Sequence, residues 1–271
     1  MSVTKEHSVI SRILHKEMLD LLAKDKRIDG RSLSEFRKIE FETGLLKKAE
    51  GSALVTLGGT KVLVGVKVEV GTPFPDTPDQ GVLTVNAELL PLASPTFEPG
   101  PPDERSIALA RYVDRSIRES KSIDLEALAL KPGKVVYVVY VDVYVLDYNG
   151  NMTDTAVLAA VKALENTNMK KFNIEGDVPV FSGELMPLIV KDYPVSTTFG
   201  IVGEKWFVDP DLEEEQASEG FTSFTYTRDG NLCAVMKNDQ GYLSPPQIFE
   251  MLDTGWEKAK EIGRIMNWRS D

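Results

Sequence analysis

The chain has 271 residues, 42% hydrophobic and 27% charged, and its 31 basic and 42 acidic side chains give a net charge of −11. This balance excludes a uniformly basic nucleic-acid coat protein, and the composition is that of a folded protein with a substantial core. The single cysteine, Cys233, excludes an internal disulfide, and the two histidines, His7 and His15, lie near the N-terminus. Chemistry in the main body must therefore proceed without a histidine base.

The charge is unevenly distributed along the chain. Residues 175–271 hold 8 basic and 18 acidic side chains, so an anionic polymer would have to approach through a basic patch elsewhere. No segment reaches the ~18 to 20 apolar residues that a membrane span needs. Residues 1–29 mix charged with apolar side chains, unlike a secretion signal. We therefore expect a cytoplasmic protein with no membrane partner.

The first predicted elements are one helix and a series of strands. Apolar residues at helical spacing predict an amphipathic helix over Val9–Leu22, within a lead-in at residues 1–30. Proline-rich loops are predicted at 71–81 and 94–102. Runs of β-branched residues predict strands over Ile39–Thr43, Ala53–Leu57, Val62–Val70 and Val82–Leu90.

Two further helices flank one long predicted strand. Asp103 or Ser106 can cap a helix over about 103–120, with prolines just upstream. The run Val135–Leu146 is rich in β-branched and aromatic residues and predicts a central strand. After a turn at 148–151, an alanine-rich helix is predicted over about Thr153–Asn166, capped by Thr153 or Asp154.

Strand patterns return after Gly176, and a helix follows them. The predicted strands are Leu188–Val190, Thr197–Val202, Trp206–Val208, Ser223–Tyr226 and Cys233–Met236. Ser244 then caps a final helix that extends to about Trp268. The mixed order of strands and helices predicts an α+β protein of two halves, at residues 31–190 and 191–271.

Arg111, Arg115 and Arg118 share an arc of roughly 60° on the predicted helix at 103–120. Arginines on one helical face can hold successive phosphates of a nucleic-acid strand by charge-assisted, forked hydrogen bonds. The same spacing is also typical of a solvated face paired with Asp114 and Glu119. The spacing alone therefore leaves both interpretations open.

The run from Asp209 to Glu215 contains five carboxylates, at positions 209, 211, 213, 214 and 215. Magnesium takes several carboxylate oxygens, so the run is a candidate metal site. Acidic residues beside a β-turn are more often solvated surface, and the sequence favours that interpretation.

Five segments together resemble one known family: KRIDGRSLSEFRKIEFETGLL, GSALVTLGGTKVLVGVKVEV, NAELLPLASPTFEPGPPDERSIALARYVDRSIRESKSID, YVDVYVLDYNGN and VDPDLEEE. They are similar to the ribonuclease PH family, in particular to the non-catalytic ring subunits of archaeal exosomes, over about Lys26 to Trp268. The resemblance implies a ribonuclease PH-like fold, with two βαβα-type halves that have mixed sheets and packed helices. It also implies a heterohexameric ring in which this subunit alternates with a catalytic paralogue and RNA-binding cap subunits attach. That ring degrades single-stranded RNA from the 3′ end with inorganic phosphate as the nucleophile.

The sequence departs from the catalytic members of that family at two places. Their turn before the long helix carries a Ser/Thr-Arg pair that binds the attacking phosphate, and the matching residues here are Met152 and Thr153. Their two aspartates, six residues apart, fall near Glu215 and Phe221. A Met-Thr pair supplies no positive charge, and phenylalanine supplies no carboxylate. We therefore expect no catalytic residue, no cofactor and no metal in this chain.

The resemblance places RNA contacts on the helix at 103–120 instead. Arg111 and Arg115 match positions at which the non-catalytic subunits contact RNA beside the partner's active site. Arg118 lies on the same face, and Arg105 falls near an arginine pair of the catalytic paralogue. We expect these arginines to bind the RNA backbone without base specificity, because phosphate contacts report charge and geometry alone.

Three functions therefore stand open. The leading hypothesis is a non-catalytic subunit of a phosphorolytic 3′-to-5′ exoribonuclease complex, which shapes the paralogue's active site and binds RNA. The second is a self-sufficient phosphorolytic exoribonuclease that uses Asp209, Asp211 and Glu215 in a shifted arrangement. The third is a pure assembly subunit whose arginines pair with acidic groups of a neighbour.

Overall fold

The computed structural model describes residues 9–239, 241–266 and 268, and it has the α+β class that the sequence predicts. The helices are α1 (Val9–Leu22), α2 (Glu104–Glu119), α3 (Met152–Glu165), α4 (Leu212–Ala217) and α5 (Pro245–Ile265). The strands are β1 (Ile39–Thr43), β2 (Gly51–Leu57), β3 (Thr60–Gly71), β4 (Val82–Leu89), β5 (Ala129–Lys131), β6 (Val135–Asp147), β7 (Asn168–Glu175), β8 (Val178–Pro187), β9 (Val195–Val202), β10 (Lys205–Val208), β11 (Gly220–Tyr226) and β12 (Leu232–Asp239).

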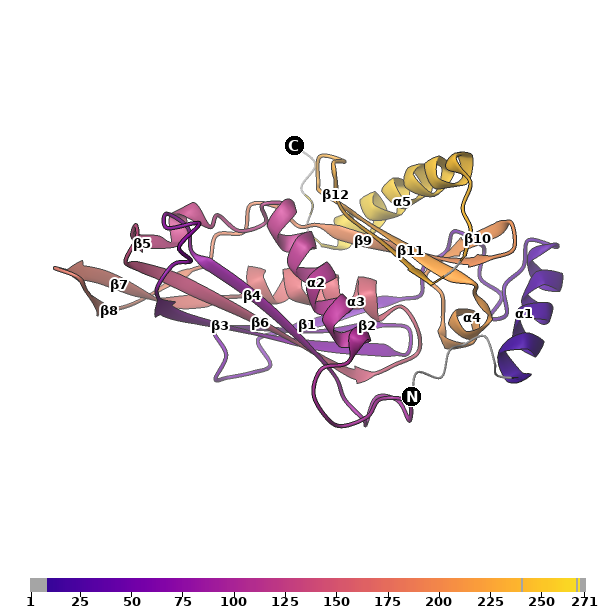
Figure 1. Cartoon of the computed structure of the whole chain (residues 1–271), viewed down its shortest axis with the longest axis horizontal. Helices are drawn as coiled ribbons and strands as arrows, with labels where there is room; N and C mark the ends of the chain where they lie inside the picture. Colours follow the sequence, from indigo (N-terminus) through magenta and orange to yellow (C-terminus); the bar gives the residue numbers. More distant parts are fainter. Residues whose placement is uncertain (1–8, 240, 267, 269–271) are drawn as a thin grey trace.

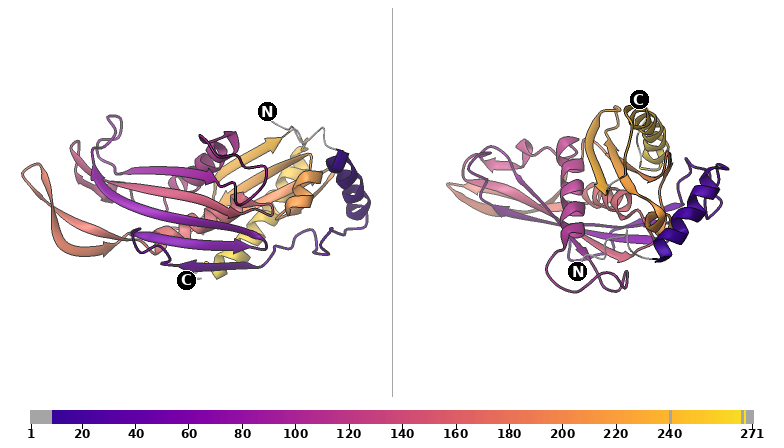
Figure 2. Two further views of the ribbon diagram at one scale, coloured as in Figure 1. Left: turned by 90° about the horizontal axis from the view of Figure 1, so that it is seen from below. Right: turned by 45° about the vertical axis from the view of Figure 1, so that its right-hand side comes forward.

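Two sheets lie on either side of α2 and α3 (Figure 1). The first has the order β1-β2-β3-β6-β4, with β5 paired to β6, and it is mixed because β4 runs parallel to β6. The second has the order β10-β9-β11-β12 and is antiparallel throughout. Helix α5 packs on the second sheet, and the right-hand view of Figure 2 shows α2 standing between the two sheets.

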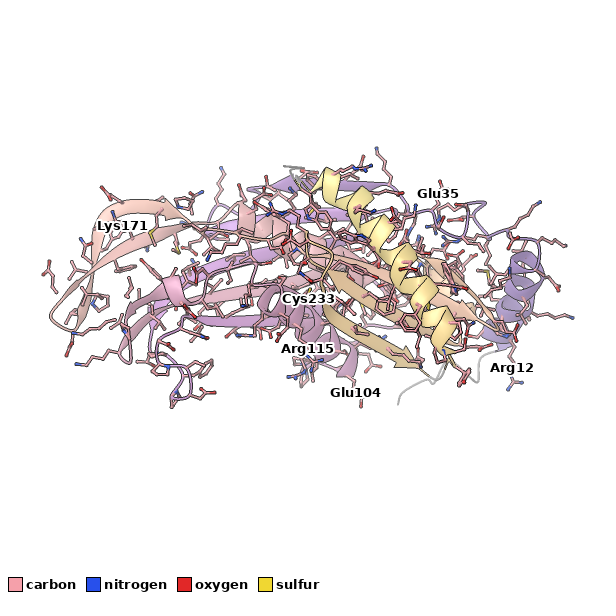
Figure 3. All side chains as sticks on the ribbon, turned by 90° about the horizontal axis from the view of Figure 1, so that it is seen from above. Arg12, Glu35, Glu104, Arg115, Lys171 and Cys233 are labelled. Atoms are coloured by element: carbon pink, nitrogen blue, oxygen red, sulfur yellow. The ribbon has the colours of Figure 1, made fainter. Side chains whose placement is uncertain are left out.

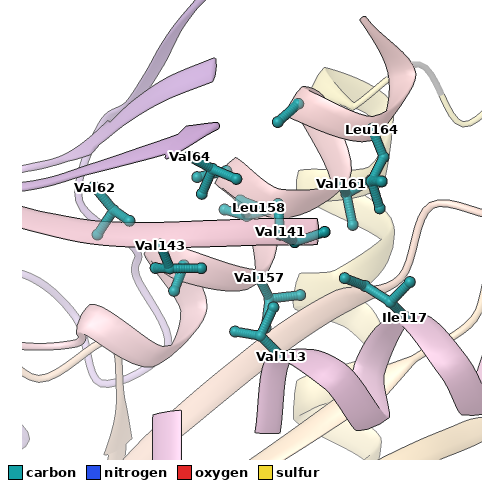
Figure 4. Close-up of a cluster of buried hydrophobic side chains, with 14 of the residues drawn as sticks. Val62, Val64, Val113, Ile117, Val141, Val143, Val157, Leu158, Val161 and Leu164 are labelled. Carbon is teal, nitrogen blue, oxygen red and sulfur yellow. The ribbon is translucent and has the colours of Figure 1, made fainter. Parts of the chain in front are cut away.

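The main core forms where the two middle helices meet the first sheet (Figure 4). Val113 of α2 and Val157 of α3 are completely buried there, as are Val64 and Val141 of the sheet. Such β-branched residues alternate along the strands, so one face of the sheet is apolar. Burial of each of these side chains contributes about 1.5 to 3 kcal/mol. This packing fixes α2 and α3 against a rigid support.

Strands β9 and β11 are buried along their whole length, because helices cover both faces of the second sheet. Both strands extend beyond the predicted ranges and begin at Val195 and Gly220. The prediction was too short because polar residues such as Ser196 and Thr222 do not look like core residues in the sequence. Their hydroxyls are nevertheless buried.

The hairpin β7-β8 was not predicted, and it projects from one end of the molecule (Figure 1). Pro179 and Gly183 interrupt the β8 pattern, but a two-stranded ribbon tolerates such residues because each strand has an open edge. The predicted strand at Leu188–Val190 is wrong, since only Val190 forms an isolated bridge, to Ile123.

The helix caps agree with the predictions at two of three positions. Of the two predicted candidates, Asp103 and not Ser106 caps α2, and Ser244 caps α5 as predicted. Asn151 caps α3 in place of Thr153 or Asp154, which both lie inside the helix. Helix α5 ends at Ile265.

Helix α1 docks on its own chain. Met18 and Leu22 pack against Val202, Phe207 and Ala217, which belong to the second sheet and α4. His7 lies outside the described residues. Among the helices described here, none is both long and apolar enough to span a membrane.

The thiol of Cys233 is held under α2. Its Sγ lies 3.4 Å from the carbonyl oxygen of Thr225 and 4.0 Å from that of Ser116. Burial, with the nearby charge of Asp192, raises the pKa of this thiol to about 12. We expect iodoacetamide at pH 8 to alkylate Cys233 about a hundredfold more slowly in the folded protein than in urea, because only the thiolate is nucleophilic. Equal rates in the two conditions would contradict this placement of Cys233.

Candidate functional site

Arg111 and Arg115 project from the outer side of α2. The inner side of the helix buries Leu109, Tyr112 and Val113, so the arginines at the other positions face solvent. Figure 3 shows Arg115 at the surface of the molecule. Within the part of the chain that the structure describes, neither guanidinium forms a hydrogen bond or an ion pair. Both are therefore available to an external anion.

Arg118 and Arg105, the other two predicted RNA contacts, are engaged within the chain. Arg118 Nη2 donates to Asp114 Oδ1 at 2.7 Å, which is the intrahelical pairing that the alternative interpretation predicted. Arg105 Nε donates to Asp103 Oδ2 at 2.9 Å, and its guanidinium lies 5.0 Å from the ring centre of Phe97. The predicted set of four thus divides into two available and two internally paired arginines.

The acidic run lies beside the turn before α3, and part of it is buried. Asp209 and Glu214 are completely inaccessible to solvent, so the interpretation as solvated surface is wrong for both. Asp211 caps the short helix α4 and accepts a hydrogen bond from the Glu214 amide at 2.9 Å. Among the described residues, no three His, Cys, Asp or Glu side chains are grouped so that they could hold a metal ion.

Three arginines near the N-terminus neutralise the buried acids, and sequence reasoning missed their role. Arg27 donates through Nε to Glu214 Oε1 at 2.8 Å and through its terminal nitrogens to the carbonyl oxygens of Val208 and Asp209. Arg31 Nη1 donates to Asp209 Oδ2 at 2.9 Å. A signal was present, because the segment from Lys26 to Lys38 is locally basic while the acidic run is locally negative.

Asp209 is bound most extensively by Arg37. The Arg37 side chain donates to both carboxylate oxygens, at 2.7 and 2.9 Å, and its backbone amide adds a third hydrogen bond at 2.8 Å. Burial raises the pKa of Asp209, but Arg37 and Arg31 outweigh it and hold the pKa below its usual value. This carboxylate is therefore a structural group that is ionised at neutral pH.

Glu215 closes the turn that precedes α3. Its Oε1 accepts from the Asn151 backbone amide at 2.8 Å, and its Oε2 accepts from the Tyr148 hydroxyl. Burial and the Glu215 carboxylate raise the pKa of Tyr148 well above its usual value, so this hydroxyl keeps its proton and donates. Gly150, at φ +81°, lets the turn lie against the backbone of Asp211, because a Cβ at this position would lie 2.4 Å from the Asp211 carbonyl carbon.

Two strained residues meet at this turn. Asn151 (φ +52°) and Asp209 (φ +49°) both adopt the left-handed conformation that costs non-glycine residues about 1 to 3 kcal/mol. The Asn151 Nδ2 donates to Asp209 Oδ1 at 2.8 Å and so joins the turn to the acidic run. Chemically, an internal carboxylate already occupies the amide at the start of α3, and the following residues, Met152 and Thr153, carry no positive charge. Phe221 lies in β11 and is 9% exposed.

Two family models match the chain, at residues 35–170 and at residues 192–258. They describe domains 1 and 2 of the 3′ exoribonuclease family, that is, the ribonuclease PH domains. The chain belongs to the 3′ exoribonuclease family. The match confirms the family resemblance that the sequence motifs indicated, and the α+β fold is the one expected for a member of the 3′ exoribonuclease family.

Proteins named exosome complex component Rrp42 are similar to this member of the family over nearly its full length. That of Thermococcus gammatolerans is 48% identical over 260 residues, which cover 95% of each chain. That of Pyrococcus furiosus is 47% identical over 261 residues, which cover 95% of this chain and 94% of the relative.

Two solved structures are also similar. A chain of the Archaeoglobus fulgidus exosome with RNA bound to the active site is 44% identical, with a TM-score of 0.89, and the match covers 96% of this chain and all of the other. A chain of an archaeal exosome core is 42% identical, with a TM-score of 0.82, and the match covers 94% and 96% of the two chains.

Proposed function

We propose that this chain is a non-catalytic ring subunit of an exosome, which degrades RNA from the 3′ end by phosphorolysis in the cytoplasm. It alternates with a catalytic paralogue in a heterohexameric ring that carries RNA-binding cap subunits, and it shapes the paralogue's active site. Residues 31–190 and 191–271 are its two ribonuclease PH-like halves, after a lead-in at 1–30. The relatives named as exosome components, which match nearly the full length of this chain, support this assignment.

The observation that carries the non-catalytic role is the Glu215 carboxylate at the start of α3. An attacking phosphate would need positive charge and free donors at this turn, and the Asn151 amide is already bound to Glu215. Asp209 is held by arginines, and Asp211 caps α4. The three acids of the self-sufficient enzyme hypothesis are therefore all committed to structural contacts, and this argues against that alternative.

The available side chains of Arg111 and Arg115 support a role in RNA binding. Two guanidinium groups, four residues apart on one helix and without a partner among the residues that the structure describes, can contact neighbouring phosphates of a single strand. A pure assembly subunit would instead present them to acidic groups of a neighbour. The chain carries an overall charge of −11, which repels RNA, and these two guanidinium groups supply positive charge locally.

Co-expression of the chain with its catalytic paralogue tests the proposal. We expect the two proteins to elute together at the native mass of a heterohexamer, and the complex to release nucleoside diphosphates from RNA in the presence of phosphate. Crosslinking should attach RNA to residues 105–118. Separate elution of the two chains would contradict the ring assignment, and crosslinks that avoid α2 would favour the assembly role.

A further inference from the structure

A chain of buried hydroxyl groups joins α2 to α3 through the second sheet. Tyr112 lies on α2 one residue after Arg111, and it is buried, at 3% exposed, whereas Arg111 is exposed. Its hydroxyl accepts a hydrogen bond from Thr225 Oγ1 of β11 at 2.9 Å and lies 3.1 Å from Ser196 Oγ of β9. Ser196 Oγ in turn donates to Asp154 Oδ1 at 2.7 Å. The path therefore runs from the RNA-contact helix to the start of α3.

The available protons fix which hydroxyl donates to which along this path. A hydroxyl group has a single proton, and Ser196 uses its proton on Asp154. The Tyr112 hydroxyl must therefore donate to Ser196, and Thr225 donates to Tyr112. Every proton in the path points toward the carboxylate of Asp154.

Asp154 accepts hydrogen bonds from this path and also from Thr198 and Asn151. Its two oxygens also accept from Thr198 Oγ1 at 2.7 Å, from the Thr198 amide at 2.8 Å and from Asn151 Nδ2 at 2.8 Å. All four partners are donors, so the site fits an anion and not a protonated acid, which would need an acceptor. Burial raises the pKa of Asp154 to about 6, which leaves it ionised at neutral pH. Its position in the first turn of α3 also favours negative charge.

We propose that the buried hydroxyl path from Tyr112 through Ser196 to the Asp154 carboxylate fixes the orientation of α2, so that these three are positioning residues for Arg111 and Arg115. The RNA part of this inference rests on the proposed function. Apolar contacts of Val113 and Ile117 hold α2 on the core, but such contacts are not directional. The hydrogen bonds of Tyr112 are directional, and they fix the rotation of the helix about its axis.

The variant Tyr112→Phe removes one hydroxyl. Ser196 then loses its donor, and Thr225 loses the Tyr112 acceptor and keeps only Ser116 Oγ, which lies 3.0 Å from Thr225 Oγ1. The matched control is Tyr137→Phe, because the Tyr137 hydroxyl is also buried and bonded, to Lys170 and Phe172 of β7, away from α2. The first readout is the alkylation rate of Cys233 in the full chain, since this only cysteine lies under α2 beside Ser116 and Thr225.

We expect Tyr112→Phe to raise the Cys233 alkylation rate about fivefold, as the loss of one buried hydrogen bond implies. We expect the same variant to weaken RNA binding by the reconstituted ring about fivefold. In a ring that already carries Arg111→Ala and Arg115→Ala, Tyr112→Phe should have no further effect on RNA binding, because it acts through those arginines. Tyr137→Phe should leave both the alkylation rate and the RNA affinity unchanged.

An unchanged alkylation rate in Tyr112→Phe would overturn the inference, and so would an equal loss of RNA affinity with and without the two arginines. Failure of the proposed function looks different. There, the variant without Arg111 and Arg115 would bind RNA normally, whatever Cys233 reports about α2.

Discussion

Replacing Arg27 by methionine will lower the free energy of unfolding by about 3 to 5 kcal/mol, because it leaves the carboxylate of Glu214 buried without a full partner. The side chains of Arg27 and Glu214 are both completely inaccessible to solvent. Arg27 also donates to the carbonyl oxygens of Val208 and Asp209, which lose these bonds in the variant. Urea unfolding of the purified chain, followed by far-ultraviolet circular dichroism, measures the change.

The double variant Arg27→Met with Glu214→Gln is the matched control. Glutamine has nearly the shape of glutamate but no charge, so we expect the double variant to recover part of the lost stability. If the charge of Glu214 carries the cost, the double variant will be more stable than Arg27→Met alone. A double variant that is less stable than Arg27→Met alone would show that the unpaired charge of Glu214 does not carry the cost.

Replacing both Arg111 and Arg115 by alanine will weaken RNA binding by the reconstituted ring about a hundredfold, or about tenfold for each charge-assisted contact. Each lost phosphate contact also removes about 0.7 from the slope of log affinity against log salt concentration. The double variant should therefore show a salt slope about 1.4 smaller in magnitude. Fluorescence anisotropy with a labelled oligoribonucleotide, over a salt series, measures both quantities.

Arg264→Ala is the control for overall charge. Arg264 is exposed in the last turn of α5, a helix that packs on the second sheet rather than beside α2. We expect it to leave the affinity and the salt slope nearly unchanged. Equal losses in Arg264→Ala and in the α2 variant would reduce the role of α2 to nonspecific charge.

The sequence predicted elements whose pattern is local. Helix α2, with its cap at Asp103, and the long strand β6 follow from spacing and β-branched residues, and the structure confirms both. Prediction from the sequence failed where contacts between distant residues decide the structure. The acidic run around Asp209 led to the prediction of a solvated carboxylate. Only the fold brings Arg37, 172 positions away, into contact with it.

The candidate site divides in the same way. Arg111 and Arg115 could be predicted as candidates from the helical face and the family resemblance. Only the structure shows that Arg118 pairs with Asp114, whereas these two have no such partner in the described part of the chain. The sequence predicts no phosphate site at Met152 and Thr153, because neither side chain carries positive charge. That Glu215 fills the turn from within was not visible, because Tyr148 and Asn151 are far from it in the sequence.

The proposed non-catalytic role depends most on the closure of the turn before α3 by Glu215. Its most direct test is an assay of whether the isolated chain releases nucleoside diphosphates from RNA. With RNA, inorganic phosphate and magnesium, and with the paralogue shown to be absent by mass spectrometry, we predict no release above the buffer control. The ring reconstituted with the paralogue should release diphosphates under the same conditions. Shortening of a labelled oligoribonucleotide by the isolated chain, abolished by Glu215→Ala, would contradict the account.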